Sequence, residues 1–90
     1  MYKIFREDKF IKKAKKFFKK HPEFVVKFKE IVGKLERNPF DNSLKTHKLK
    51  GNLQSFYACS LNYEYRIILN IIVVDNKIFL IDIGTHDEVY

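Results

Sequence analysis

The chain has 90 residues, 46% of them hydrophobic, and its nine Phe and five Tyr can build the core of one small domain. Only three Gly and two Pro argue against a disordered or fibrous segment. The formal net charge of +7 indicates an anionic partner, which is most often nucleic acid, an acidic protein or an anionic membrane surface. A basic protein that is simply soluble is the alternative.

The single cysteine excludes a disulfide within the chain. Cys59 falls in an alternating apolar run, so we expect a buried thiol rather than a nucleophile. The first eight residues contain no apolar signal core, and the longest apolar run, 67–74, has the length of a strand. A membrane span needs about 18 apolar residues. We therefore expect a cytoplasmic protein without a membrane partner.

A short strand is expected at residues 2–5, followed by a helix that Asp8 caps. The apolar residues of this helix recur at the spacing of one helical stripe, namely Phe10, Ile11, Ala14, Phe17 and Phe18. The remaining surface of the helix carries seven lysines. These lysines would contact RNA, including that of the ribosome, or would form an ordinary solvated face. Because the apolar stripe is clean, we do not expect them to be catalytic.

His21-Pro22 separates this helix from a second one, which is expected to begin at Pro22 because its missing N–H would be unpaired there anyway. The same apolar spacing repeats from Phe24 to Leu35. Asn38-Pro39 ends the second helix, since the residue before a proline avoids the α region. With so short a connection, the two helices should form an antiparallel hairpin.

The C-terminal half supplies the surface that the hairpin needs. Residues 40–54 predict a loop with a short strand, and residues 56–61 alternate with the period of a strand. Residues 65–74 predict a central strand, which turns at 75–77 and returns over 78–83. The order βααβββ predicts an α+β fold in a single domain, residues 1–90, with a mostly antiparallel twisted sheet and the helical hairpin on one face.

The register of the last two strands decides which polar residues meet. A three-residue loop at 75–77 would place Arg66 opposite His86 and Asn70 opposite Asp82, with all four side chains on one face. A two-residue loop would instead place Arg66 opposite Thr85. We prefer the first register because it gathers the polar groups in one place.

The sequence lacks metal-ligand spacing, a glycine-rich phosphate loop and a serine nucleophile elbow, so we expect no metal and no other cofactor. The polar residues that remain lie in the C-terminal half: His47, Lys48, Lys50, Tyr63, Glu64, Tyr65, Arg66, His86, Asp87, Glu88 and Tyr90. These residue types suit metal-free RNA cleavage, because histidine can transfer protons, arginine binds phosphate and aromatic rings stack on unpaired bases. Arg66 stands out as a charge in an apolar strand, although an ion pair with Glu64, Asp82 or Asp87 would also explain it.

At three places the sequence resembles the RelE/YafQ family of bacterial toxin ribonucleases. These places are His47-Lys48-Leu49-Lys50-Gly51, Tyr65-Arg66-Ile67-Ile68 and the ending Ile83-Gly84-Thr85-His86-Asp87-Glu88-Val89-Tyr90. The resemblance extends over essentially the whole chain, and its most specific parts are the H-x-L-x-G segment and the I-G-T-H ending followed by an aromatic residue. It implies a type II toxin that cuts mRNA in the ribosomal A site without a metal, and a cognate acidic antitoxin that blocks it.

The resemblance also implies roles for single residues. His86 matches the general acid, and Tyr90 matches the aromatic residue that holds the substrate. Arg66 matches a phosphate contact, and His47 matches a further histidine of the family's site. Contacts to the RNA backbone or substrate are expected from Lys45, Lys48, Lys50, Glu64 and Tyr65.

Several positions depart from the pattern of YafQ, among them Lys48 in place of a proline and Glu64-Tyr65 in place of an Asp-Trp pair. Ser60 stands where YafQ has a histidine, and Asp82 stands where it has an arginine, which Arg66 would have to replace from the neighbouring strand. Two other functions therefore remain open. One is non-enzymatic inhibition of DNA gyrase, as in the related ParE toxins, and the other is an inactive relative that only binds an antitoxin.

Overall fold

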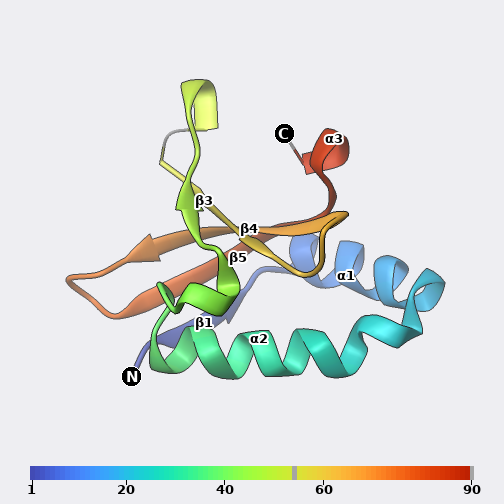
Figure 1. Ribbon diagram of the computed structural model, residues 1–90, viewed down its shortest axis with the longest axis horizontal. Helices are drawn as coiled ribbons and strands as arrows, with labels where there is room; N and C mark the ends of the chain where they lie inside the picture. The colour runs from blue at the N-terminus through green and yellow to red at the C-terminus, as the bar shows by residue number, and fades with distance from the viewer. Residues whose placement is uncertain (54, 90) are drawn as a thin grey trace.

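The computed structural model describes residues 1–53 and 55–89, and it contains one sheet of five strands (Figure 1). The strands are ordered β1 (Lys3–Arg6), β5 (Lys77–Thr85), β4 (Tyr65–Ile72), β3 (Tyr57–Ser60) and β2 (His47–Lys48). Only β1 is parallel to its neighbour; the other pairs are antiparallel. The predicted α+β fold with a mostly antiparallel sheet is confirmed.

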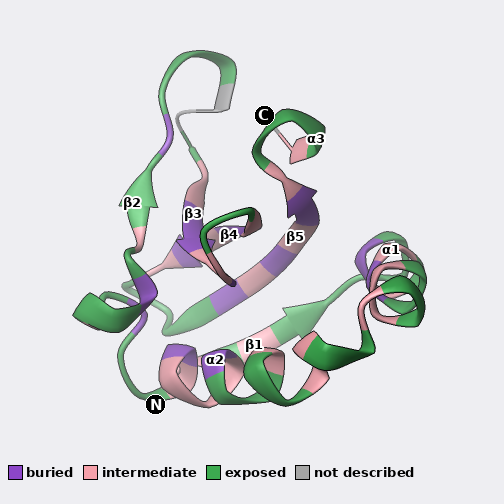
Figure 2. Cartoon of the chain, turned by 45° about the vertical axis from the view of Figure 1, so that its right-hand side comes forward, coloured by how far each residue is buried: buried purple, intermediate pink, exposed green. Residues whose placement is uncertain are grey.

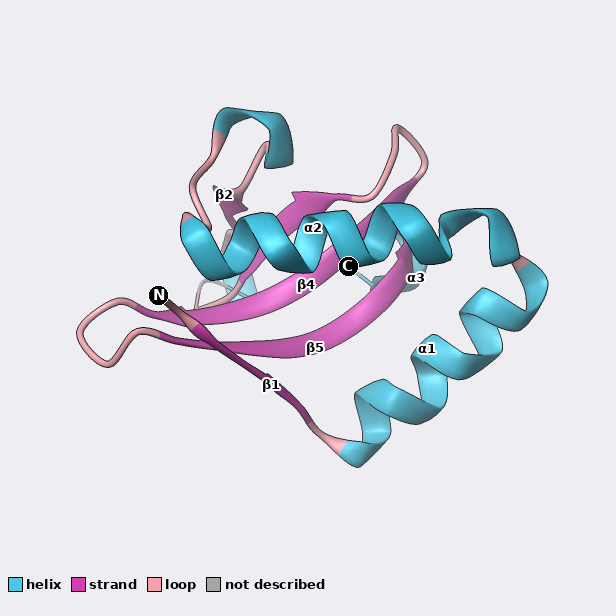
Figure 3. Cartoon of the chain, turned by 90° about the horizontal axis from the view of Figure 1, so that it is seen from below, coloured by secondary structure: helices cyan, strands magenta, loops and turns pink. Residues whose placement is uncertain are grey.

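The two long helices bury their apolar stripes against one side of this sheet. Helix α1 (Asp8–Lys20) runs beside β5, and α2 (Val25–Arg37) crosses the sheet, as Figure 3 shows. Both contribute buried side chains to the main core, together with the apolar residues of β3, β4 and β5. The helical periodicity of the sequence was therefore a correct guide to which side of each helix is covered.

The start of the second helix differs from the prediction. Pro22 opens a 3-10 turn, Pro22–Phe24, and α2 begins only at Val25. In this tighter turn the N–H of Phe24 donates to the carbonyl of His21 at 3.1 Å. The Phe24 ring then packs near Phe17 and Tyr65, with ring centroids 6.1 and 5.6 Å away.

Cys59 lies in β3 with 0% of its surface exposed, which confirms the expected buried thiol. Burial raises the pKa of this thiol to about 12, because the apolar surroundings disfavour the thiolate. A thiol that stays protonated at neutral pH is a poor nucleophile.

A second, smaller core lies on the face of the sheet opposite α2. Its buried residues are Leu49, Ala58 and Ile68, and Phe56, Ile81 and Val89 pack around them. On this side the segment that contains β2 and the short helix α3 (His86–Val89) both project from the sheet, as Figures 1 and 2 show. This face, rather than the helix-covered one, therefore carries the β2 segment and the chain's last helix.

The β4–β5 register differs from both predicted alternatives. Residues 73–76 form a four-residue turn, with Asn76 in the left-handed region at φ 54°. Ile68 pairs with Asp82 but Leu69 pairs with Leu80, so one extra residue forms a β-bulge in β5.

The turn and the bulge together change the polar pairs. Arg66 lies opposite Gly84, and Asn70 lies opposite Phe79. The predicted pairs of Arg66 with His86 and of Asn70 with Asp82 are wrong. Asp82 instead forms a salt bridge with Lys13 of α1. In the described ranges, no helix is both long and apolar enough to cross a membrane.

Candidate active site

The β2 strand places His47 on the face opposite the helices. His47 pairs with Ala58, which pairs with Ile68, and directly paired residues in antiparallel strands share a face. The Nδ1 atom of His47 lies 3.0 Å from the carbonyl oxygen of Lys45. A neutral ring whose Nδ1–H donates to this carbonyl keeps its lone pair on Nε2, where it can accept a proton.

Short-range hydrogen bonds hold the loop that leads into β2. The carboxylate of Asp41 accepts from the N–H and the hydroxyl of Ser43, at 2.9 and 2.6 Å. These bonds lower the pKa of Asp41, with further contributions from Lys34 and Arg37. The hydroxyl of Thr46 donates to the carbonyl of Pro39 at 2.6 Å. The loop therefore reaches His47 through fixed local geometry.

Arg66 shares its face with His47. It pairs with Ser60 in β3 and with Gly84 in β5, one row beyond the Ala58–Ile68 pair. Its Nη1 atom donates to the carbonyl oxygens of Asn62 and Tyr65, at 2.7 and 3.2 Å. Of the five N–H groups of a guanidinium, those on Nη2 and Nε remain available for a phosphate.

The ion-pair alternative for Arg66 fails. Among the described residues, no salt bridge joins Arg66 to Glu64, Asp82 or Asp87. Arg66 is half-buried, and the charge in this strand is stabilised by carbonyl groups of the β3–β4 turn rather than by a carboxylate. In the described part of the chain, no carboxylate pairs with the guanidinium, so an anionic ligand can take that place.

A groove of about 530 Å³ brings His47 and Arg66 together at the β3 side of the sheet. It is lined by Lys27, Ser43, Lys45, His47, Ser60, Leu61, Asn62, Tyr63 and Arg66. These lining residues include several cations and no carboxylate, so the groove attracts anions such as RNA phosphates.

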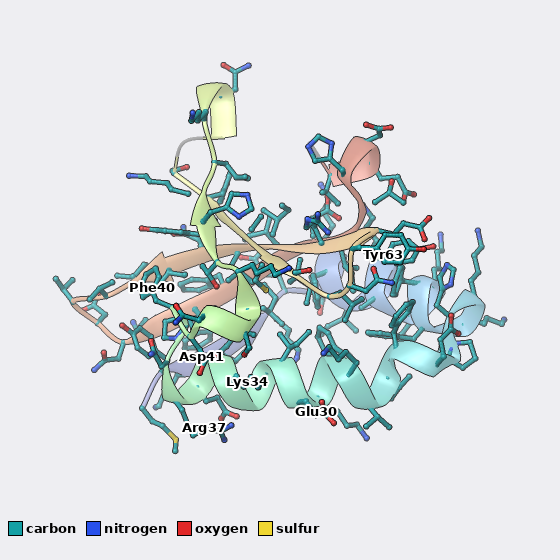
Figure 4. All side chains as sticks on the ribbon, in the orientation of Figure 1. Glu30, Lys34, Arg37, Phe40, Asp41 and Tyr63 are labelled. Carbon is teal, nitrogen blue, oxygen red and sulfur yellow. The ribbon has the colours of Figure 1, made fainter. Side chains whose placement is uncertain are left out.

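Among the groove residues that the sequence did not point to as contacts, Lys27 and Tyr63 are the two best suited to bind RNA. Lys27 comes from α2, a helix that the sequence pattern assigned only to the core. Tyr63 was noted among the polar residues but given no role, and its ring is 89% exposed. Figure 4 shows Tyr63 projecting from the β3–β4 turn, where an exposed ring can stack on an unpaired base. No sequence signal pointed to Lys27, because its place depends on how α2 crosses the sheet.

His86 lies at the first position of α3, directly after β5. Its side chain is 63% exposed, and its Nδ1 atom lies 3.6 Å from a carboxylate oxygen of Asp87. His86 is not among the residues that line the groove of His47 and Arg66. Tyr90, the expected aromatic contact, lies outside the described residues.

Tyr65 and Glu64, which were both expected to contact the substrate, do not line the groove. Tyr65 packs on the helix side, where its hydroxyl lies 3.3 Å from the Nε2 atom of His21. Burial raises the pKa of the Tyr65 hydroxyl, and the nearby Glu64 raises it further. Tyr65 lines a separate cavity of about 270 Å³ beside the lysines of α1. Glu64 is exposed, and its N–H donates to the side chain of Asn62 at 2.9 Å.

The three lysines that were expected to contact RNA do not lie together. Lys45 lines the groove and has a left-handed backbone with φ 53°. Lys48 pairs with Tyr57, so it lies on the opposite face of β2 from His47. Lys50 is exposed in the segment after β2.

One comparison with known proteins, a match to a family model, covers almost the whole chain. A family model described as the bacterial toxin of a type II toxin–antitoxin system, YafQ, matches residues 2–90. A search of the curated proteins found no match. In the part of the chain that the structure describes, no group of three or more His, Cys, Asp and Glu side chains could hold a metal ion.

Several solved structures share the fold. A metal-bound toxin from Helicobacter pylori is 29% identical with a TM-score of 0.78, and each chain is covered completely. The YoeB–YefM complex from Staphylococcus aureus contains a chain that is 25% identical, with a TM-score of 0.76 and 96% and 98% of the two chains covered. YafQ from Escherichia coli is 18% identical, with a TM-score of 0.81 over 100% and 99% of the chains.

Proposed function

Because the chain belongs to the YafQ family of bacterial type II toxins, we propose that it is an endoribonuclease that cleaves mRNA on the ribosome. The observation that carries the proposal is the groove in which the His47 imidazole and the Arg66 guanidinium lie among further cations without a carboxylate. RNA presents a chain of phosphates with 2′-hydroxyls, and these groups require a positive surface and a proton acceptor.

In the proposed reaction, the 2′-oxygen of the RNA attacks the neighbouring phosphorus and the bond to the 5′-oxygen breaks. The Nε2 atom of His47 takes the proton of the 2′-hydroxyl, since its Nδ1 is engaged with the carbonyl of Lys45. Arg66 and Lys45 stabilise the charge on the phosphorane. His86 gives a proton to the leaving 5′-oxygen. The products are a 2′,3′-cyclic phosphate and a 5′-hydroxyl.

His86 is exposed in α3 and does not line the groove, whereas His47 lies in β2, so the scissile RNA would lie between β2 and α3. That path crosses the face that carries the smaller core (Figure 2). An exposed imidazole can reach a strand held by the ribosome, and catalytic hydrogen bonds often form only in the complex with substrate.

We also propose a cognate antitoxin as partner, acting with the toxin in the cytoplasm. The solved complex of YoeB with YefM is a toxin bound to its antitoxin, and the likeness of the YoeB chain supports a similar arrangement here. A net charge of +7 favours an acidic antitoxin that folds on binding.

The test uses purified toxin, ribosomes and a short mRNA, with cut sites mapped by primer extension. His47→Ala and His86→Ala should each reduce single-turnover cleavage by about 10²–10⁴-fold, the range for a general acid or base. Lys29→Ala, on an exposed part of α2 outside the groove, serves as the control and should cleave normally. An mRNA with one 2′-deoxynucleotide at the cut site should bind and remain intact.

Three outcomes would contradict the proposal. Undiminished cleavage by both histidine variants would remove the assigned roles. Intact mRNA together with inhibited DNA gyrase would instead identify a gyrase inhibitor. If neither translation nor DNA supercoiling is affected while an antitoxin still binds, the chain is an inactive binding relative.

A further inference from the structure

The helix that carries His86 is too short to be stable by itself. Helix α3 has four residues, and isolated helices shorter than roughly 12 residues are marginal in water. The place of the His86 ring therefore depends on what holds α3 to the end of β5. The described structure shows three such attachments, which are a capping box, a close approach to Gly84 and the packing of Val89.

The capping box joins the residues on either side of His86. The N–H of Thr85 donates to the Oε1 atom of Glu88 at 2.9 Å. In return, the N–H of Glu88 donates to the hydroxyl of Thr85 at 3.2 Å. This reciprocal pair spans the whole first turn, so it restricts the backbone that His86 occupies.

Gly84 lets Glu88 lie directly on the strand. A Cβ atom at position 84 would lie 3.2 Å from Oε1 of Glu88, 3.3 Å from its Cβ and 3.3 Å from Cγ1 of Val89. These distances are shorter than ordinary van der Waals contact, so a Cβ atom at this position would require the side chains of Glu88 and Val89 to shift by a few tenths of an ångström. The glycine is needed for this close approach rather than for a positive φ.

We propose that Glu88 is a positioning residue for His86, which holds α3 against Gly84 through its paired hydrogen bonds with Thr85. The inference deepens the proposed function, because it depends on His86 acting as the general acid. Glu88 is not among the residues that line the groove of His47 and Arg66, so its role here is to hold α3 rather than to bind the RNA. Its effect would be to keep the imidazole within reach of the leaving oxygen.

The surroundings of Glu88 keep its carboxylate charged. It lines a cavity with Lys13, Lys16, Lys20, His21 and Tyr65, which come from α1, the residue after it and β4. The hydrogen bonds with Thr85 lower the pKa of Glu88 most, and Lys13 and Lys20 lower it further. The carboxylate is therefore ionised at neutral pH, and its bond to the Thr85 N–H is charge-assisted.

Two substitutions of Glu88 distinguish the effect of its hydrogen bond from the effect of its charge. Glu88→Gln keeps an oxygen that can accept from Thr85, whereas Glu88→Ala removes the acceptor. We expect Glu88→Ala to lower the single-turnover rate on saturating ribosomes about tenfold without changing the half-saturating ribosome concentration. Glu88→Gln should stay within about threefold of the wild type, since a neutral acceptor is weaker than an ionised one. Gly84→Ala should resemble Glu88→Ala.

An NMR titration tests the link between Glu88 and Thr85 independently of cleavage. The amide proton of Thr85 should shift as Glu88 is protonated, and the shift should be absent in Glu88→Ala. Asp87→Asn is the matched control, because Asp87 is fully exposed in the same helix and should leave the Thr85 titration unchanged. Nuclear Overhauser effects between the His86 ring protons and the protein protons around them should be lost in Glu88→Ala and kept in Glu88→Gln.

The outcomes distinguish the two proposals. A Thr85 amide that does not respond to Glu88, or a His86 ring that keeps its contacts in Glu88→Ala, would overturn the positioning role. Wild-type cleavage by Glu88→Ala with a displaced His86 ring would instead contradict the function assigned to His86. If His86→Ala cleaves normally while the Thr85 titration behaves as expected, the function assigned to His86 fails, although α3 is still held by Glu88. Thermal unfolding of every variant shows whether a lost rate reflects a lost fold.

Discussion

Arg66 has two tasks in this structure, and replacing it should affect stability and cleavage separately. Its Nη1 atom donates to the carbonyls of Asn62 and Tyr65, at 2.7 and 3.2 Å, and so holds the β3–β4 turn. The rest of the guanidinium lines the groove. We predict that Arg66→Ala loses both tasks, whereas Arg66→Lys keeps a positive charge but loses the planar fork.

The size of the stability loss follows from the two hydrogen bonds. Bonds from a charged donor contribute about 1.5–3 kcal/mol each when well formed, and the value for a half-buried group lies at the low end. The longer bond at 3.2 Å contributes less than the shorter one. We therefore expect Arg66→Ala to lower the free energy of unfolding by about 1–3 kcal/mol. For a domain of this size, each kcal/mol corresponds to about 4–8 °C in Tm.

The cleavage loss should be larger than the stability loss can explain. Removing a preorganised donor to a developing charge typically costs about 10²–10³-fold in rate. Urea unfolding gives the stability, and single-turnover cleavage well below the Tm of each variant gives the rate. If Arg66→Ala unfolds like the wild type, the bonds to the turn are not formed in solution. If it also cleaves like the wild type, Arg66 is not the phosphate contact.

Two further predictions concern the groove and the separate cavity. Lys27→Ala and Lys45→Ala should each weaken binding to RNA and reduce the slope of log affinity against log salt concentration by about 0.7–0.9. Lys29→Ala is the control and should leave this slope unchanged. If a filter-binding titration gives equal slopes for all the variants, the groove does not contact RNA phosphates. Tyr65→Phe should lower the free energy of unfolding by about 0.5–1.5 kcal/mol, because it loses the contact with His21, yet cleave at the wild-type rate. A large loss of cleavage in Tyr65→Phe would instead indicate that Tyr65 contacts the substrate.

Much of the fold could be predicted because its causes are local. The apolar stripes of the two helices, the strand period around Cys59 and the proline at the end of the second helix all act over a few residues. Each of these features depends on backbone geometry that neighbouring residues determine. The family resemblance rested on equally local segments, and the match over residues 2–90 confirms it.

Which of the candidate site residues lie close together was harder to predict from the sequence. A four-residue turn and a bulge, each a choice of backbone that many sequences tolerate, shifted Arg66 from His86 to Gly84. Strand alternation places Tyr65 and Arg66 on opposite faces, but it could not tell that Tyr65 would meet His21 or that Arg66 would share a groove with His47.

The sequence alone therefore determined the two helical stripes, the main strands, the charge and the family. Tertiary structure alone decided which cations share a groove, because Lys27, Lys45 and Arg66 come from a helix, a loop and a strand that are distant in the chain. It also decided that α3 rests on Gly84, since that contact depends on the path of β5 beyond its bulge. Such contacts result from packing between elements, and no short sequence pattern encodes the distance between them.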